Sequence, residues 1–325
     1  PEYVVDKATK LETIYDRIHE VRTRFEVVKR DAVVEYLKAI IDGGDPDTLK
    51  VELDERLAKL DDDFAFIAEC NMGGEFMAPE LVARVKEIAA IKWSRTISDR
   101  LGLSYEEQKR MGRTPEPALP VVENLLSDRE DHIIYRETTE PAAANDNPYG
   151  FKLDVPEHKY NRGEVYNLSI GRGTLTEEER FKINDHIVQT IIMLEQLPFP
   201  KHLARVPEYA GGHHEKMDGT GYPKKLNRDN MSVPARIMAI ADIFEALTAA
   251  DRPYKPAKPL SACVKIMSFM KKDAHIDTEL FELFLSSGVY KEYAERFLDP
   301  SQIDDVDISE YLPKPDADAA AAGDD

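Results

Sequence analysis

The feature that most restricts the fold of this chain is a run of apolar residues near its beginning, spaced at alternating steps of three and four. This spacing places every member of the run on one side of an α-helix, whereas a half-buried strand would need a period of two. We therefore predict a helix that continues to about Asp42. The residues of the run are Leu11, Ile14, Ile18, Val21, Phe25, Val28 and Ala32.

A second helical stripe follows a short break. Gly43, Gly44, Asp45 and Pro46 are typical of a turn, and the next apolar residues again recur at helical spacing as far as Gly73. Two such helices joined by a short turn predict an antiparallel helical hairpin. The apolar stripes could pack within the chain or pair with a second copy as a coiled coil, and the pattern leaves both alternatives open. The residues of the second stripe are Leu53, Leu57, Leu60, Phe64 and Ile67.

The remainder of the chain also has helical periodicity, apart from a proline-rich stretch at 112–165 that we interpret as loops with short elements. Thr176 followed by three glutamates is typical of a helix N-cap and an acidic first turn. The strongest strand candidate is 131–137, so we predict an all-α protein. The expected helices are 79–94, 176–195, 201–213 with a break at Pro207, 234–250, 260–270 and 277–285.

Composition excludes several classes of protein. The 43 Lys and Arg residues against 62 Asp and Glu give a net charge of −19, which argues against a broad surface for nucleic acid or an anionic membrane. Two cysteines, Cys70 and Cys263, cannot form a disulfide framework, and no stretch approaches 18 consecutive apolar residues. We therefore expect a cytoplasmic protein that neither spans a membrane nor binds nucleic acid directly. Residues 201–260 are the exception to the acidity, with ten Lys and Arg against seven Asp and Glu.

The unusual residues lie within that locally basic stretch, at 213–223, where the sequence reads His-His-Glu-Lys-Met-Asp-Gly-Thr-Gly-Tyr-Pro. Adjacent histidines at a helix end can reach one site where the helix unwinds, and the surrounding glycines permit such unwinding. Neutral imidazoles are good ligands for Fe, Mn or Zn. His213 and His214 are therefore candidate metal ligands.

Two further residues strengthen that interpretation. His186 lies in the middle of the predicted 176–195 helix, and Asp242 interrupts an otherwise apolar helix. We expect Asp242 to be buried, and a buried carboxylate needs a cation or a hydrogen-bond donor. The alternative to a metal ion is a salt bridge to an arginine such as Arg236.

These motifs together resemble the HD-GYP family, all-α bacterial phosphohydrolases of the HD metal-dependent superfamily that cleave cyclic di-GMP. The resemblance covers about 165–285 and is carried by the 213–223 motif, by Leu-Thr-Glu-Glu-Glu at 175–179 followed by His186, by Ala-Asp-Ile-Phe-Glu-Ala-Leu-Thr at 241–248 and by Asp-Arg-Pro-Tyr-Lys at 251–255. It implies an HD-domain-like helical bundle into which the long hairpin is inserted.

The resemblance also implies residue roles. His186, His213, His214 and Asp242 would be metal ligands, with two divalent ions in a complete site and Fe or Mn favoured. Gly221, Tyr222 and Pro223 would shape the substrate pocket. Arg252 and Lys255 would hold the phosphate, since a guanidinium fork and an ammonium both suit phosphate oxygens. The alternative for this last pair is ordinary charge on a solvated loop.

One departure from the family pattern concerns its eponymous His-Asp pair, because no His-Asp dipeptide occurs in this chain. The opening residues resemble the stretch that follows that pair, so we expect the chain to begin just after it; the alternative is a degenerate member without the pair. This predicts four regions. They are a remnant at 1–11, a helical insertion with proline-rich loops at 12–150, an HD-GYP-like domain at 151–312 and a disordered acidic tail at 313–325.

The function that follows is metal-dependent hydrolysis of cyclic di-GMP, incomplete in a fragment that lacks the His-Asp pair. The alternative is a non-catalytic module with a degenerate metal site that binds a cyclic dinucleotide or serves as a scaffold. The expected partners are the cyclic dinucleotide and a second copy of the chain, bound through the N-terminal helices.

Overall fold

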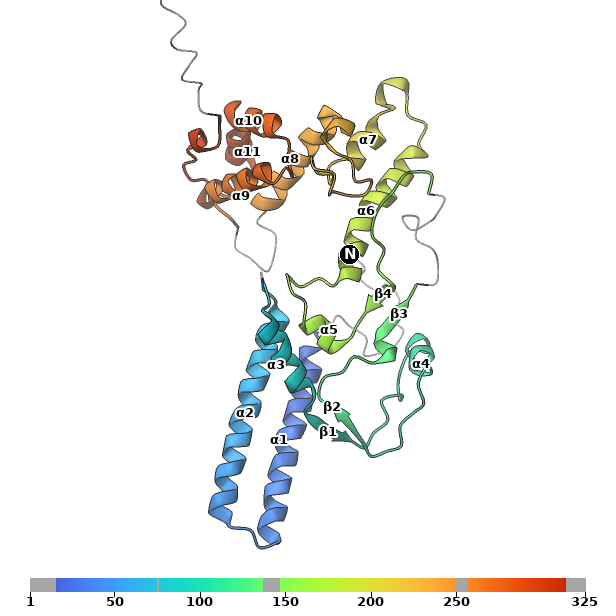
Figure 1. Ribbon diagram of the computed structural model, residues 1–325, viewed down its shortest axis with the longest axis vertical. Coiled ribbons are helices and arrows are strands. Elements are labelled where there is room, and N and C mark those ends of the chain that lie inside the picture. Colours follow the sequence, from blue (N-terminus) through green and yellow to red (C-terminus); the bar gives the residue numbers. More distant parts are fainter. Residues whose placement is uncertain (1–15, 75, 137–146, 250–256, 314–325) are drawn as a thin grey trace, which may run out of the picture. The chain divides into compact units, whose positions relative to one another are not determined.

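The computed structural model describes residues 16–74, 76–136, 147–249 and 257–313 (Figure 1). The chain divides into two compact units, one formed by 1–138 and 156–180 and the other by 139–155 and 181–325. The predicted four-region division stays a prediction, and its 1–11 segment and nearly all of its acidic tail lie outside the described residues.

The first unit is built on the predicted hairpin. Helices α1 (Ile18–Ile41) and α2 (Pro46–Met72) lie side by side in Figure 1. The turn between them ends at Asp45, whose carboxylate accepts a hydrogen bond from the Thr48 backbone N–H at 2.9 Å and caps α2. The apolar stripes of both helices meet in one core, which includes Val21, Phe25, Val28, Leu60 and Ile67. Val21, Phe25 and Val28 of the α1 stripe are therefore buried within the chain itself.

The proline-rich region adds two small sheets to this unit. Helix α3 (Pro79–Ala89) ends earlier than predicted, because the chain enters strand β1 (Lys92–Arg95), which pairs antiparallel with β2 (Val121–Asn124). Strand β3 (Ile133–Tyr135) falls within the 131–137 strand candidate and pairs with β4 (His158–Asn161). Two short helices complete the unit, α4 (Tyr105–Met111) and α5 (Glu164–Leu168). With only these two-stranded sheets among the described residues, the predicted all-α class is confirmed.

The second unit is helical. Helix α6 (Glu177–Glu195), which belongs to this unit from Phe181 onward, is capped as predicted by Thr176, whose hydroxyl accepts from the Glu179 N–H at 3.2 Å. The expected 201–213 helix is shorter, because it breaks into a 3-10 turn and α7 (Val206–Gly211). Helix α8 (Val233–Thr248) contacts α9 (Leu260–Lys272) and α10 (Thr278–Ser286) around a core that includes Phe244, Met267 and Phe281. Helix α11 (Val289–Phe297) was not predicted. No helix within the described residues has the length and apolarity needed to cross a lipid bilayer.

Candidate metal centre

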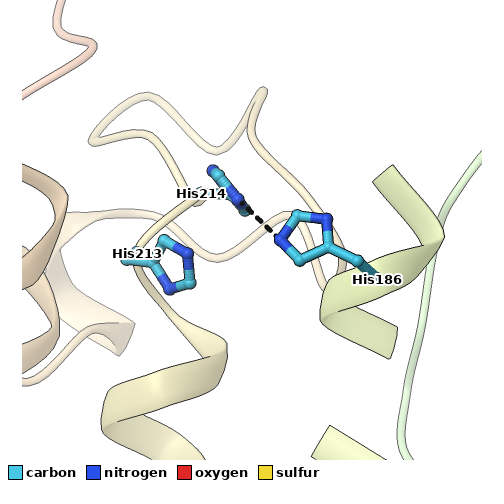
Figure 2. A group of neighbouring side chains, drawn as sticks. All are labelled: His186, His213 and His214. Atoms are coloured by element: carbon cyan, nitrogen blue, oxygen red, sulfur yellow. Dashed lines mark hydrogen bonds between the residues drawn. The ribbon is translucent and has the colours of Figure 1, made fainter. Parts of the chain in front are cut away.

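Three predicted ligands converge in the second unit. His186 comes from α6, while His213 and His214 follow the end of α7, and Figure 2 shows the three side chains gathered together. One ring nitrogen from each lies within 4.8 Å of those from the other two. The Nε2 atoms of His186 and His214 are 3.2 Å apart. The chain thus brings together histidines that are 27 and 28 residues apart in sequence.

Backbone carbonyls orient two of these rings. The Nδ1 atom of His186 lies 2.5 Å from the carbonyl oxygen of Ile183, and Nδ1 of His213 lies 2.7 Å from that of Ala210. Because a carbonyl only accepts hydrogen bonds, we assign the ring proton to Nδ1 in both residues. This leaves Nε2 of each ring as the nitrogen that carries a lone pair, the arrangement usual for metal-binding histidines, and in His186 this atom faces Nε2 of His214.

His214 is kept neutral by its surroundings. Its ring stacks on Tyr222, with centroids 4.8 Å apart, and lies 4.1 Å from the ring of His213. Burial lowers the pKa of His214 to about 4, the neighbouring His213 and His186 act in the same direction, and Asp242 opposes them. Burial also raises the pKa of Tyr222 to about 12, with Asp242 adding to the shift. At neutral pH this imidazole is therefore uncharged and the phenol keeps its proton.

The spacing of these nitrogens fits a single divalent cation. Two imidazole nitrogens bound at about 2.1 Å to one ion are roughly 3.0–4.2 Å apart, depending on the angle at the metal. The 3.2 Å separation of the His186 and His214 nitrogens falls within this range. In the described part of the chain, this histidine trio is the group whose ligand atoms could hold a metal ion.

The expected burial of Asp242 is wrong. Asp242 is exposed on α8, because this helix buries one face and leaves Ile237 and Met238 exposed with it on another. The salt bridge to Arg236 is also absent, since Arg236 pairs with the buried Asp277 instead. Asp242 does not belong to the group of ligand atoms within 4.8 Å, although its charge acts on His214 and Tyr222.

Glu215, the third residue of the motif, has a structural role that sequence reasoning missed. Its side chain is 1% exposed, and its two carboxylate oxygens accept hydrogen bonds from the backbone N–H groups of Lys224 at 2.6 Å and Leu226 at 2.8 Å. Burial raises the pKa of Glu215, and these backbone donors act against the shift. The carboxylate thus closes the 215–226 loop from inside. Its position directly after the two histidines was the available signal.

The predicted pocket-shaping residues lie in the same loop. A side chain at Gly221 would place its Cβ 2.4 Å from the backbone nitrogen of Lys216, so only glycine fits there. The next residue, Tyr222, presents its ring to His214. The carbonyl of Pro223 accepts from the backbone N–H of Lys152 at 2.7 Å, which attaches the 147–155 segment to the loop. This segment was not foreseen as part of the site. Arg252 and Lys255 lie outside the described residues.

Comparison with known proteins agrees with this geometry. A family model described as HD domain matches residues 120–280. The chain is 43% identical over 111 residues to 3'3'-cGAMP-specific phosphodiesterase 3 of Vibrio cholerae, covering 34% of this chain and 23% of that protein. It is 36% identical over 118 residues to a cyclic di-GMP phosphodiesterase of the same organism, covering 35% and 24%. A cyclic di-GMP phosphodiesterase of Pseudomonas aeruginosa is 39% identical over 79 residues, covering 24% and 18%.

The matched region therefore spans about a quarter or less of these relatives. Within it, the HD-domain match and the His-His-Glu-x-x-Asp-Gly-x-Gly-Tyr-Pro motif coincide with the converging histidines. Residues 120–280 of this chain therefore match the HD domain, and the motif at 213–223 within them resembles that of the HD-GYP family.

Proposed function

We propose that this chain contributes to a metal-dependent phosphodiesterase that hydrolyses a cyclic dinucleotide, with cyclic di-GMP as the expected substrate. The observation that carries the proposal is the convergence of three histidine nitrogens beside the Gly-Tyr-Pro loop. The names of the relatives supply the substrate class, since they specify cyclic di-GMP or 3'3'-cGAMP.

The donor set suits a transition metal. Neutral imidazole is a good ligand for Fe, Mn, Ni and Zn, and we propose Fe or Mn, with two ions in a complete site and Asp242 as a carboxylate ligand. Such ions would supply Lewis-acid polarisation of the phosphodiester and a source of hydroxide near neutral pH.

The chain's own residues would position the reactants. The carbonyls of Ile183 and Ala210 fix two imidazoles so that Nε2 faces the ion. The Tyr222 hydroxyl, protonated at neutral pH, is able to donate a hydrogen bond to a phosphate oxygen. We propose that Gly221, Tyr222 and Pro223 form one wall of the substrate pocket.

Arg252 and Lys255 are proposed to hold the phosphate in line for attack. This assignment rests on their match to the family motif at 251–255.

The proposed homodimer would use residues of the hairpin other than its buried stripe. Val34, Leu37 and Ile41 of α1 are exposed at spacings of three and four, and they form the apolar strip available to a second copy. A cytoplasmic location remains part of the proposal.

The test is hydrolysis of cyclic di-GMP and 3'3'-cGAMP, followed chromatographically with added Mn²⁺ or anaerobic Fe²⁺. It is run on this chain and on the full product of its gene. We expect His213→Ala to abolish turnover and metal binding, and His202→Ala, an exposed histidine outside the trio, to change neither. Calorimetric binding of the dinucleotide by a metal-loaded full-length protein that leaves it intact would refute catalysis and support the binding-module alternative.

A further inference from the structure

A polar pocket lies wholly within the first unit and shares no residue with the histidine trio. It has a volume of 420 Å³ and is bounded by the start of α1, by α4, by the β1–β2 sheet and by the residue that follows β4, elements coloured blue to green in Figure 1. Its most unusual feature is the number of guanidinium groups around it. These belong to Arg17, Arg24, Arg95, Arg110, Arg129 and Arg162.

Carboxylates neutralise three of these arginines. Each of the three contacts two acidic side chains, so five carboxylates surround three guanidiniums and leave that side of the pocket with no excess positive charge. The pairs are Arg24 with Glu20 and Glu164, Arg95 with Glu123 and Asp99, and Arg129 with Asp99 and Asp131, all at 2.8–3.2 Å.

The other three arginines have no such partners. Within the described residues, Arg17, Arg110 and Arg162 form no ion pair within 4.0 Å. Arg17 instead donates from Nη1 to the backbone carbonyl of Arg162 at 2.7 Å. The sixth acidic group, Glu107, accepts hydrogen bonds at 3.0 and 3.2 Å from Ser104, the N-cap residue of α4.

The electrostatics reflect this imbalance. Desolvation lowers the pKa of Arg162, the positive charges of Arg110 and Arg17 lower it further, and Glu107 acts against them. In contrast, the hydrogen bonding of Arg95 to the Glu123 carboxylate, in which the guanidinium donates, is the largest influence on the pKa of Arg95 and raises it. Six guanidiniums and six carboxylates line the pocket, so its positive charge is local: it is concentrated at Arg17, Arg110 and Arg162, which have one of the six carboxylates, Glu107, near them.

We propose that this pocket binds a small phosphate-bearing molecule, with Arg17, Arg110 and Arg162 as the groups that contact the phosphate. A guanidinium offers planar pairs of donors that match phosphate oxygens, and it stays charged at any physiological pH. The volume of 420 Å³ lies within the usual range for small-molecule sites and exceeds what a single phosphate fills. The ligand therefore has further groups, for which the size of a nucleoside monophosphate is suitable.

The chain carries its own reporter for this site. Trp93 lines the pocket and is the one tryptophan in the sequence, so tryptophan fluorescence, excited selectively over tyrosine, reports on this location alone. The probes are inorganic pyrophosphate and GMP, titrated into metal-free protein at constant ionic strength. We expect a saturable change in Trp93 fluorescence with either probe, and tighter binding of GMP if the ligand is a nucleotide.

Variants identify the contacting groups. We expect Arg110→Gln and Arg162→Gln each to weaken binding about tenfold, because each removes a charged hydrogen-bond donor to the phosphate. Arg30→Gln is the matched control, since Arg30 is an exposed arginine of α1 that does not line the pocket. His213→Ala should bind both probes as the unaltered protein does, which separates this site from the proposed catalytic one.

The proposal is overturned if neither probe produces a saturable change at millimolar concentration, or if both arginine variants bind like Arg30→Gln. Circular dichroism of each variant shows whether it has folded. Should Arg162→Gln not fold, Arg110→Gln carries the test, because Arg110 lies on α4, is only partly buried and forms no side-chain hydrogen bond or ion pair with another described residue.

Discussion

The replacement of Glu215 by glutamine tests whether the motif's glutamate holds the loop closed. Both carboxylate oxygens accept a backbone N–H, from Lys224 and from Leu226. A glutamine amide has one oxygen and one NH₂, so in either orientation a donor faces a donor. The loss of one charge-assisted bond, together with a buried N–H left without a partner, costs about 3 kcal/mol.

This cost predicts a measurable change in melting temperature. A unit of this size loses roughly 2–4 °C per kcal/mol, so Glu215→Gln should lower the midpoint of thermal unfolding by about 6–12 °C, as followed by circular dichroism. Because the loop positions Tyr222 against His214, metal binding should also weaken. Glu295→Gln, an exposed glutamate on α11, is the control and should change neither quantity. Equal melting temperatures for the two variants would refute the assignment of Glu215 as the residue that closes the loop.

Three further predictions concern other parts of the molecule. Gly221→Ala should lower the free energy of unfolding by about 1–3 kcal/mol, because the added Cβ would meet backbone atoms. The control is Gly171→Ala, whose Cβ would meet nothing within 4 Å, so its unfolding free energy in chemical denaturation should be close to that of the unaltered protein. Ile67→Ala, in the hairpin core, should lower the free energy of unfolding by about 2–5 kcal/mol, whereas Val51→Ala, at an exposed position of the same helix, should change it little. Equal midpoints of urea unfolding for the two variants would contradict this packing. Desolvation and the charge of Lys216 lower the pKa of His275, with Asp218 and Asp273 opposing, so the unfolded chain binds this proton at a higher pH than the folded one. Metal-free protein should therefore lose stability as pH falls below about 6.5, and His275→Asn should show a shallower loss.

Local sequence patterns were sufficient to predict most of the helices. The apolar stripe of α1 and the turn residues Gly43 and Asp45 were sufficient to predict the hairpin, because helix periodicity and caps act within a few residues. The short strands were harder to predict. A four-residue strand such as β1 has too few positions for its alternation to stand out from the preceding helix, and it is stabilised by pairing with β2, which lies 25 residues further along the chain.

The candidate site was likewise predicted only in part from the sequence. Motif spacing identified His186, His213 and His214, and the structure places their nitrogens together. The same reasoning mistook Asp242 for a buried residue, because an apolar run in sequence does not say which side of the helix is covered. It also missed the pairing of Arg236 with Asp277, since these residues are 41 positions apart.

The sequence alone determined the helical class, the hairpin and the three histidines that we propose as metal ligands, because each was recognised from residue type and local spacing. Tertiary structure alone decided which nitrogen of His186 and of His213 faces a backbone carbonyl, that Glu215 closes the loop, and that three arginines share a pocket without an ion pair to any other described residue. These properties depend on distances between distant segments. The sequence identifies each acidic residue and each arginine, but it does not show whether folding places an oppositely charged group beside it.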